Sequence, residues 1–590
     1  MSENKKHGSQ QSVNQAIKAI CDIMRRANCQ GAMQYVPELT WILFLRILDE
    51  MESQEAENAL MQNQPYFASL ESPYRWCDWA APCDEMYCKE HPEDDTVQGW
   101  KRYQLQKTTT VKQWINTQLI PHLKALEHKP YASQRQKVIS EIMSGVESTR
   151  IDSDLNLLEI FDKVHGLSGS SVDDQHVFTL SQVYEGLLLS MGEKGNDGGQ
   201  FFTPREIIRM MIKVVNPKIG QTVYDPCCGT GGFLAQAMEY MAGKDDKGNY
   251  FPDKSSQEID ILKHKTFYGR EKDNQVYPIA LANLILHSID SPQLWHGNTL
   301  DGAVTYDGLF GNPPAVFDVI LTNPPFGGKE GKAVKDKYGT GATQICFLQH
   351  VQENLKEGGQ CAIVMDEGVL FRTNESGFVD TKRRLLNDCN LWCIVSLSGG
   401  VFTSAGAGVK TNVLFFTEGK ATEKIWYYDL SGIKVGKRTP LTLEHFNEFF
   451  ELLPKRSDSQ NSWTIDFKQL KLDAEQQALP LDQLAAEKRQ QVITLKEQAK
   501  DCRKNKTADT VSQELELEKF ISALEKEINE LDAKAKTIRN AIYDLKAVNP
   551  NIKEVIDNRT PADLIDFIAS QSRDVMALLN QLQPTVTATE

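Results

Sequence analysis

The stretch Phe317-Asp318-Val319-Ile320-Leu321-Thr322-Asn323-Pro324-Pro325-Phe326 joins a short apolar run to a rigid turn. The run has the composition of a buried β-strand. The two prolines stiffen the turn and remove backbone N–H donors, so the Asn323 side-chain oxygen and the Pro324 carbonyl are offered as fixed hydrogen-bond acceptors. Phe326 adds an aromatic face beside them. We therefore predict a strand that ends in a binding site for a planar amine.

A planar amine is a poor nucleophile because its lone pair is delocalised into the neighbouring ring or carbonyl group. Two acceptors for its N–H groups would turn that lone pair toward a methyl donor, and Phe326 could stack on an extruded base. A second Asn-Pro-Pro, at residues 312–314, is followed by Ala315 instead of an aromatic residue and follows a glycine-containing loop. An isolated Asn-Pro-Pro is typical of a surface turn, so the context of Asn323 carries the interpretation.

Strands and helices are expected to alternate around this turn, from about residue 167 to residue 417. Short apolar strands separated by helices indicate a mostly parallel α/β sheet covered on both faces, with ligands bound at the carboxyl ends of the strands. The predicted strands are Thr222–Asp225, Thr266–Gly269, Phe317–Thr322, Gln360–Met365, Cys393–Leu397 and Asn412–Thr417.

A glycine-rich turn, Asp225-Pro226-Cys227-Cys228-Gly229-Thr230-Gly231-Gly232, follows the first predicted strand. Its glycines allow a tight turn and a close approach of the backbone to a ligand. The spacing is neither that of a dinucleotide fingerprint nor that of a phosphate-binding loop. An acid in front of a helix N-terminus suits a zwitterionic ligand, because Asp225 would hold an ammonium group. Cys227 is interpreted as a packing residue.

Three further segments are candidates for the same ligand site. The second strand ends in Gly269-Arg270-Glu271-Lys272-Asp273, where Glu271, or less favourably Asp273, would bind ribose hydroxyls. Gly297-Asn298-Thr299-Leu300 precedes the Asn323 strand, and Asn298 could contact an adenine edge. Upstream, Gln200-Phe201-Phe202-Thr203-Pro204-Arg205-Glu206 has the spacing of a capping box from Thr203 to Glu206, with Pro204 at the first helical position.

The flanking regions are predicted to be helical. Apolar residues recur at helical spacing from Val13 to about residue 166, with a second helix opening at Pro37 and an irregular insertion over residues 53–102. The domain division that follows is 1–166 helical, 167–420 α/β and 421–590 mainly helical. Residues 517–545 repeat apolar positions at 4-3 spacing, which favours a helical hairpin or a partner-facing coil over a homodimer zipper. The tail after Gln583 is expected to be disordered.

The bulk composition sets limits on the function. The chain has 590 residues, with 41% hydrophobic and 25% charged residues, as in ordinary globular proteins. It has no apolar stretch of membrane-spanning length, and twelve scattered cysteines suggest a reducing cytoplasm. Cys77, Cys83, Cys88 and His91 lack zinc-site spacing, so no metal is predicted. A net charge of −15 argues against strong unaided binding to nucleic acid.

These motifs together resemble the S-adenosylmethionine-dependent DNA adenine-N6 methyltransferases of the gamma arrangement, in which the cofactor motifs precede the catalytic one. Segments such as Phe347-Leu348, Leu355-Lys356-Glu357-Gly358-Gly359 and Lys410-Thr411-Asn412 are similar to the modification subunit of type I restriction-modification systems. The resemblance covers about residues 10–420. It implies a methyltransferase core of Rossmann-like fold with an N-terminal helical domain and a C-terminal helical or coiled-coil region.

The resemblance implies roles for individual residues. Asn323 and Pro324 would accept hydrogen bonds from adenine N6, with Pro325 in the same turn, and Phe326 would stack on the flipped base. The residues implied to bind S-adenosylmethionine are Gln200, Phe201, Phe202, Thr203, Asp225, Pro226, Gly229, Thr230, Gly231, Gly232, Glu271, Asn298, Thr299, Leu300 and Asn323. Asn298 and Ser398-Gly399 depart from the common family pattern, in which Asp and Pro, respectively, are common.

The resemblance also implies partners: double-stranded DNA, a specificity subunit that reads the target, a second copy of the chain and a restriction subunit. The heptads over 517–545 are expected to contact the specificity subunit. The lysines at 329, 332, 335 and 337 are expected to form either a loop ordered by DNA or a flexible exposed loop. The alternatives are a self-sufficient adenine DNA methyltransferase, a protein-glutamine or guanine-N2 methyltransferase, and a scaffold without activity.

Overall fold

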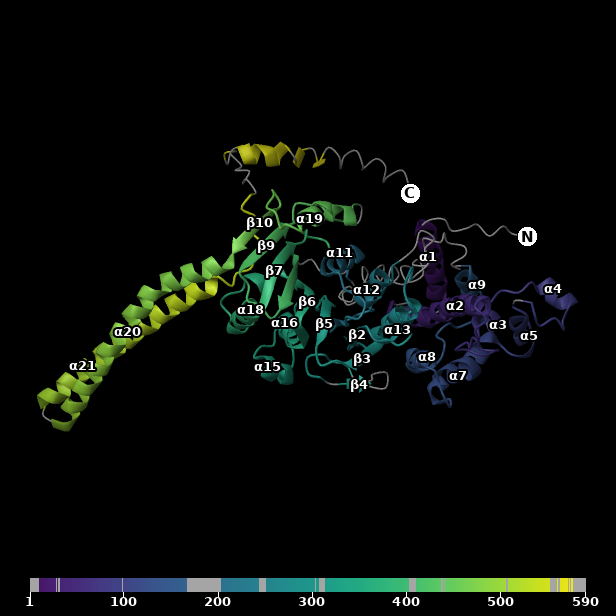
Figure 1. The fold of residues 1–590 in the computed structure, drawn as a ribbon, viewed down its shortest axis with the longest axis horizontal. Helices are drawn as coiled ribbons and strands as arrows, with labels where there is room; N and C mark the ends of the chain where they lie inside the picture. The colour runs from purple at the N-terminus through teal and green to yellow at the C-terminus, as the bar shows by residue number, and fades with distance from the viewer. Residues whose placement is uncertain are drawn as a thin grey trace. The chain divides into compact units, whose positions relative to one another are not determined.

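The fold is seen in a computed structural model of the chain (Figure 1). The ranges that it describes are residues 10–27, 29, 32–97, 99–166, 203–243, 251–302, 304–306, 313–402, 410–436, 439, 441–505, 508–551, 560, 563–570, 572–573 and 575–576. Three predicted site residues, Gln200, Phe201 and Phe202, lie outside these ranges, as does the tail after Gln583. Two compact units are distinguished, residues 1–547 and residues 548–590.

A ten-stranded sheet forms the centre of the first unit, in the order β10-β9-β7-β8-β6-β5-β1-β2-β3-β4. The adjacent strands β3, β2, β1, β5 and β6 are parallel to one another, whereas β8 is antiparallel to both β6 and β7. The strands are β1 Val223–Asp225, β2 Phe267–Glu271, β3 Gln293–Gly297, β4 Val304–Tyr306, β5 Phe317–Thr322, β6 Leu355–Asp366, β7 Cys389–Ser396, β8 Thr411–Glu418, β9 Lys424–Asp429 and β10 Ser462–Asp466.

All six predicted strands are confirmed, and β5 has the predicted bounds. The central strands are apolar along their length because both faces of the sheet are covered. In β6, Cys361 and Ile363 belong to one buried cluster, whereas Ala362 and Val364 belong to the other. The strands that the sequence did not indicate, β3, β4, β9 and β10, lie toward the two edges of the sheet.

Helices cover the sheet and bring the upstream segments to it. Helix α11 begins directly after Pro204, and α12 begins directly after the glycine-rich turn. The helices of this region are α11 Arg205–Val215, α12 Gly232–Ala242, α13 Ser256–His264, α14 Val276–Leu286, α15 Lys332–Tyr338, α16 Thr343–Asn354, α17 Glu367–Phe371, α18 Ser376–Asp388 and α19 Asn447–Leu452, with a 3-10 turn η6 at Leu443–Phe446.

All the secondary-structure elements described within residues 10–166 are helices or helical turns, as predicted. The elements are α1 Gln10–Arg26, α2 Ala32–Met61, α3 Trp76–Trp79, α4 Glu85–Glu90, α5 Trp100–Thr108, α6 Val111–Trp114, the π-helical turn η1 Ile115–Leu119, α7 Ile120–Lys124, the 3-10 turn η2 Leu126–His128, α8 Gln134–Ser144 and α9 Asp154–His165. The second helix does not open at Pro37, since α2 begins five residues earlier and contains that proline.

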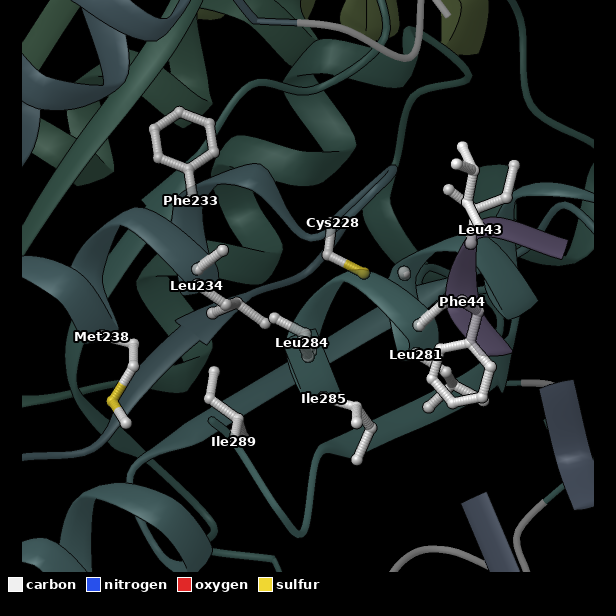
Figure 2. Packing of buried hydrophobic residues seen from close by; sticks show 14 of the residues in the cluster. Leu43, Phe44, Cys228, Phe233, Leu234, Met238, Leu281, Leu284, Ile285 and Ile289 are labelled. Atoms are coloured by element: carbon white, nitrogen blue, oxygen red, sulfur yellow. The ribbon is translucent and has the colours of Figure 1, made fainter. Parts of the chain in front are cut away.

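The N-terminal helices share one hydrophobic core with the α/β region. Figure 2 shows Leu43 and Phe44 of α2 in the same cluster as Leu281 and Ile285 of α14. Beside this core, the Arg135 guanidinium donates to Asp290 at 2.6 Å and to Glu55 at 2.8 and 3.1 Å. The pKa of Asp290 is held below its ordinary value, because Arg135 and Lys263 outweigh the effect of burial.

The prediction of an irregular insertion over residues 53–102 is wrong in one respect. The segment contains loops, but it also contains α3, α4 and the start of α5, and it supplies Trp76 and Trp79 to the core. Both indoles are edge-on to Phe161 of α9, at centroid distances of 5.6 and 5.2 Å. Large aromatic rings of this kind supply much of the buried apolar area of a small helical domain, so this segment is part of the core.

The sheet continues past the predicted domain boundary at residue 420, because β9 and β10 extend its edge. Helices α20 (Phe467–Asn505) and α21 (Ala508–Ala541) then lie side by side as an antiparallel hairpin (Figure 1). Leu517, Ile521, Leu524, Ile528 and Leu531 of the predicted heptads pack against α20. The predicted hairpin is confirmed, except that Tyr543 and Leu545 lie beyond α21 and pack against the sheet. Within the second unit, residues 563–570 are helical.

No helix in the described ranges is both long enough and apolar enough to cross a membrane.

Trp76→Ala tests whether the 53–102 segment is part of the core. Loss of a fully buried indole costs about 3–5 kcal/mol, so the apparent Tm of the purified chain should fall by several degrees. The exposed Phe67 of the same segment provides the matched control, since Phe67→Ala removes an aromatic ring that is 87% exposed. Equal Tm values for the two variants would contradict the assignment.

Candidate active site

A cavity of about 620 Å³ opens at the carboxyl ends of β1, β2, β3 and β5. This is the edge at which parallel α/β sheets bind ligands. The predicted site residues in its wall are Thr203, Asp225, Pro226, Gly229, Thr230, Gly232, Glu271, Asn298, Thr299, Leu300, Asn323 and Pro325. Gly231, Pro324 and Phe326 are next to the cavity in sequence but do not line it.

The glycine-rich turn has a backbone that only glycine adopts easily. Gly231 has a φ of +78° as the residue that precedes α12, and a Cβ added to it would come within 3.2 Å of Leu284. Asn283 of α14 fixes the turn by donating from its side-chain amide to the Thr230 carbonyl at 2.8 Å. The turn is therefore held between α12 and α14 with its backbone facing the cavity, and Gly231 supports it from behind.

Two carboxyl groups are buried at the cavity wall, Asp225 at the end of β1 and Glu271 at the end of β2. Asp225 is 1% exposed and accepts hydrogen bonds from the Thr322 hydroxyl at 2.7 Å and the Cys227 N–H at 3.2 Å. Burial raises the pKa of Asp225 to about 7, although these hydrogen bonds oppose the shift. A carboxyl group with this pKa changes its charge near neutral pH.

Glu271 is held in the same way. Its two oxygens accept from the Gly229 N–H at 2.9 Å and from the Asp273 N–H at 2.7 Å. Burial raises the pKa of Glu271 to about 7. Glu271 therefore bridges the glycine turn and the loop after β2, and lone pairs of both oxygens are left for a ligand hydroxyl. Asp273, the weaker candidate, caps the following helical turn by accepting from the Gln275 and Val276 N–H groups.

Asn298 organises its own loop while it lines the cavity. Its oxygen accepts from the Leu300 N–H at 3.1 Å, and its amide nitrogen donates to Asp301 at 2.8 Å. Thr299 next to it donates its hydroxyl to the Pro226 carbonyl. The loop after β3 is thereby tied to the glycine turn after β1. This contact explains why two motifs 73 residues apart share one wall.

The turn after β5 offers the predicted acceptors. Asn323 lines the cavity, and its Oδ1 is buried and accepts no hydrogen bond from any described residue. The Pro324 carbonyl accepts one long hydrogen bond, from the Gln344 amide at 3.4 Å. Phe326 is half-buried and lies edge-on to Phe402, with ring centroids 5.3 Å apart. Two acceptors and an aromatic ring thus sit within four residues, and Asn323 and Pro325 of this turn line the cavity.

The predicted capping box at Thr203 is wrong. Pro204 is the N-cap residue of α11, and no side chain caps the helix. Glu206 instead pairs with Arg209 at 3.3 Å. The Thr203 hydroxyl accepts a hydrogen bond from the Asn323 amide nitrogen at 2.9 Å. The local sequence could not show that Thr203 bonds to Asn323 instead of capping the helix, because Asn323 lies 120 residues further along the chain.

The four lysines after the turn do not form the predicted loop throughout. Lys332, Lys335 and Lys337 belong to α15, whose Val334 and Tyr338 are buried with Leu300, Cys346 and Phe347. Lys337 also donates to the Leu300 carbonyl at 3.1 Å. Lys329, Lys332 and Lys335 are exposed. Helix α15 therefore packs against Leu300 and Phe347, which line the cavity, without lining the cavity itself, and it exposes its lysines.

Sequence reasoning missed several residues of the cavity wall. Phe347 of α16 and Arg270 of β2 both line it, and the Arg270 guanidinium lies over the Trp295 ring at 4.3 Å. Glu330 also lines it and accepts from the Thr343 hydroxyl at 2.8 Å. Arg270 stands inside the quoted Gly-Arg-Glu motif, so its position was a usable signal. No sequence pattern indicated the contact of Glu330 with Thr343, because it forms only when the chain through α15 brings the two residues together.

Comparison with known proteins gives two matching family profiles. The N-6 DNA Methylase family matches residues 175–538, and the HsdM N-terminal domain matches residues 13–144. The methylase subunit of the type I restriction enzyme EcoEI from Escherichia coli is 32% identical over 74% of this chain and 82% of its own length. That of EcoKI, from strain K12, is 30% identical over 73% and 74%.

Solved structures agree in fold. A type I restriction enzyme modification subunit from Vibrio vulnificus has a TM-score of 0.63 at 28% identity, covering 78% of this chain and 93% of its own. A chain from a study of complex assembly in a type I R-M system has a TM-score of 0.59 at 28% identity, covering 99% and 100%.

Asp225→Asn tests the raised pKa. In the unsubstituted chain the cost of burying this carboxylate grows as pH rises from its ordinary pKa of 3.8 to the folded value of about 7, and is complete above that. The Asn variant should therefore gain stability over the unsubstituted, ligand-free chain, by on the order of 2 kcal/mol more at pH 8 than at pH 5. Thermal melts at both pH values measure it, with exposed Asp501→Asn as the control. An equal gain at both pH values would contradict the raised pKa.

Proposed function

This chain belongs to the N-6 DNA methylase family, and from that premise we propose that the cavity binds S-adenosylmethionine and that the Asn323 turn methylates N6 of an extruded adenine. The observation that carries the proposal is the buried, unpaired Asn323 Oδ1 at the wall of a cavity with two buried carboxyl groups. An amine donor would supply the partner that Asn323 Oδ1 lacks, and a cofactor with hydroxyl and ammonium groups would supply further donors to the two carboxyl groups.

The cavity wall suits each part of the proposed cofactor. The Asp225 carboxylate can accept from an ammonium group, and the Glu271 oxygens from ribose hydroxyls. Apolar side chains, Ile208 and Phe233 at one end and Leu300 and Phe347 at the other, line the rest. When bound, S-adenosylmethionine supplies an activated methyl group on its sulfonium. The ammonium group of the cofactor binds best to a deprotonated Asp225. We therefore expect the affinity for S-adenosylmethionine to rise as the pH increases through about 7, the pKa of Asp225 and Glu271.

The mechanism is a direct displacement. Asn323 Oδ1 and the Pro324 carbonyl accept the two N–H groups of adenine N6 and turn its lone pair toward the methyl carbon. With S-adenosylmethionine bound, this arrangement would let N6 take up the methyl group directly, and the surplus N6 proton would pass to solvent. Phe326 stacks on the flipped base, and Phe402 supports its ring from the side. No covalent enzyme intermediate is required, because N6 itself is the nucleophile.

The proposed partners are double-stranded DNA, a specificity subunit that reads the target, a second copy of the chain and a restriction subunit. The relatives are named as subunits of type I restriction enzymes, which supports an assembly of this kind. The net charge of −15 gives an independent reason, since tight unaided binding to phosphates needs an excess of Lys and Arg. We place this assembly in the cytoplasm, where twelve free thiols are compatible with the redox conditions.

The alternatives have less support. A protein-glutamine or guanine-N2 methyltransferase could use the same turn, but the family matches cover both the N-terminal helical region and the core. A self-sufficient enzyme would need its own region for reading bases. After β10, the described first unit continues as the α20–α21 hairpin, which has paired ions between its helices, such as Lys488 with Glu527 and Lys496 with Glu525.

The hairpin is the proposed contact for the specificity subunit. Beyond the side chains buried between its helices, it exposes large apolar side chains to solvent on both. They are Leu470, Leu472, Leu479, Leu484 and Ile493 on α20, and Val511, Leu515 and Phe520 on α21. Large exposed apolar side chains on two adjacent helices are available for a contact with another protein.

Asn323→Ala tests the methyltransferase assignment. Removing one of the two acceptors should lower the rate of methyl transfer about a hundredfold or more, while S-adenosylmethionine binding by calorimetry stays within a few fold. Modification-sensitive sequencing of genomic DNA from the source strain should then show loss of N6-methyladenine at one recognition sequence. Asn390→Ala, at the opposite end of the sheet, is the control. Unchanged adenine methylation in the Asn323 variant would refute the assignment.

Ile493→Glu and Phe520→Glu test the hairpin contact. A charged side chain in a buried apolar interface should reduce co-purification of the specificity subunit at least tenfold, while S-adenosylmethionine affinity is unchanged. Deleting α21 would be less informative, because it would also uncover the buried residues Ala485 and Val492 of α20.

Leu60→Glu, at a position on α2 that is 77% exposed against 51% for Ile493 and 67% for Phe520, is the control for the hairpin variants. Retention of the complete complex by both hairpin variants would exclude this surface as the contact.

A further inference from the structure

We propose that Thr203 is a positioning residue for Asn323, because its hydroxyl oxygen accepts a hydrogen bond from the Asn323 amide and thereby aims the amide oxygen at the substrate amine. The distance from Asn323 Nδ2 to Thr203 Oγ1 is 2.9 Å. The inference rests on the proposed function, since it concerns how the adenine amine is held. It assigns Thr203 a role that acts on the catalytic turn instead of on the cofactor.

The two ends of an amide side chain have opposite hydrogen-bonding character. Asn323 can receive an N–H of the substrate only if its oxygen, and not its NH₂ group, faces the cavity. In that orientation the NH₂ group points away and needs an acceptor of its own. Thr203 Oγ1 is that acceptor, whereas Oδ1 is buried and has no partner among the described residues. The flipped amide would turn its NH₂ group toward the substrate amine, so that two donors would face each other there and the amine would not bind.

Thr203 is held firmly enough to perform this task. It precedes Pro204 and α11, whose side chains Ile207, Met210 and Met211 are fully buried. Ile208 of the same helix comes within 3.3 Å of the position that a Cβ on Gly232 would take, so α11 is packed tightly on the glycine turn. The hydroxyl is not used to cap the helix. A side chain that directly precedes a buried helix is positioned more accurately than one on a free loop.

The second acceptor of the turn is fixed independently. Gln344 donates from its amide nitrogen to the Pro324 carbonyl at 3.4 Å, and its oxygen accepts from the Asp366 N–H at 3.0 Å. Gln344 thus ties the turn to the end of β6, while Thr203 ties it to α11. With the carbonyl held by another residue, loss of the Thr203 hydroxyl should disturb only the orientation of the Asn323 amide. The cofactor contacts of Asp225 and Glu271 do not involve it.

The test uses the full chain purified in complex with its partner subunits, genomic DNA from a strain that lacks the gene, and labelled S-adenosylmethionine. Thr203→Val keeps the shape of the side chain and removes the acceptor. We expect the single-turnover rate of adenine methylation to fall about 10- to 100-fold. The dissociation constant of S-adenosylmethionine, measured by calorimetry, should change by less than about threefold. Thr203→Ser, which restores the hydroxyl, should recover most of the rate.

Thr266→Val is the matched control, since this hydroxyl donates to the Ile261 carbonyl at 2.9 Å and Thr266 is not among the residues that line the cavity. Thermal melts of all variants check that the fold is intact.

Three results would overturn the inference: full activity in Thr203→Val, equal impairment in Thr203→Ser, or a loss of cofactor affinity that matches the loss of rate. If the unsubstituted complex transfers no methyl group to adenine, the proposed function fails and this inference fails with it. If the unsubstituted complex is active and Thr203→Val is equally active, only the inference fails.

Discussion

The hydrogen bond from the Thr322 hydroxyl to the Asp225 carboxylate, across the adjacent parallel strands β1 and β5, is the contact on which the site depends. Both groups are buried, and the residue after Thr322 is Asn323. One short bond therefore joins the acid that we assign to the cofactor with the turn that we assign to the amine. Because the two strands are parallel and in register, their carboxyl ends stop at the same edge. The β1–β5 pairing thus places donor and acceptor sites side by side.

Burial of the two carboxyl groups fixes their positions, but it also raises the free energy of their charged forms. Asp225 and Glu271 are both taken from water and have raised pKa values, so the ligand-free site holds two groups that resist ionisation. A ligand with an ammonium and hydroxyl groups removes that cost by supplying partners inside the cavity. Pre-organised polar groups of this kind favour a specific ligand over water, because they need no rearrangement when it arrives. In the same way, the buried oxygen of Asn323 has no partner among the described residues until a substrate amine donates to it.

Site residues could be predicted from the sequence where a single physical requirement explains the residue type at that position. Asp225 and Asn323, at the ends of apolar strands, and Gly229, in a glycine-rich turn, were placed at the cavity because strand ends and glycine turns have local signatures. Thr203 was correctly expected at the site, but its predicted partner, the N-terminus of the following helix, was wrong. A Thr-Pro-x-Glu sequence fits a capping box, and nothing in it indicates a hydrogen bond to the distant Asn323. Strands β9 and β10 were missed because they are only six and five residues long and follow the domain boundary set at residue 420. Contacts between distant segments, such as Glu330 with Thr343, have no local pattern at all.

The distribution of charge and apolar surface links the site to its assembly. A net charge of −15 disfavours unaided binding of a long stretch of DNA, so we expect the exposed lysines near the turn, at positions 329, 332, 335 and 337, to act locally. Affinity for the target must then come from surfaces that join other subunits, and the exposed apolar side chains of α20 and α21 are of that kind. Separation of the tasks has a physical advantage. The catalytic turn can be the same for every target, because the sequence is read elsewhere, and an extruded adenine presents the same amine whatever its neighbours.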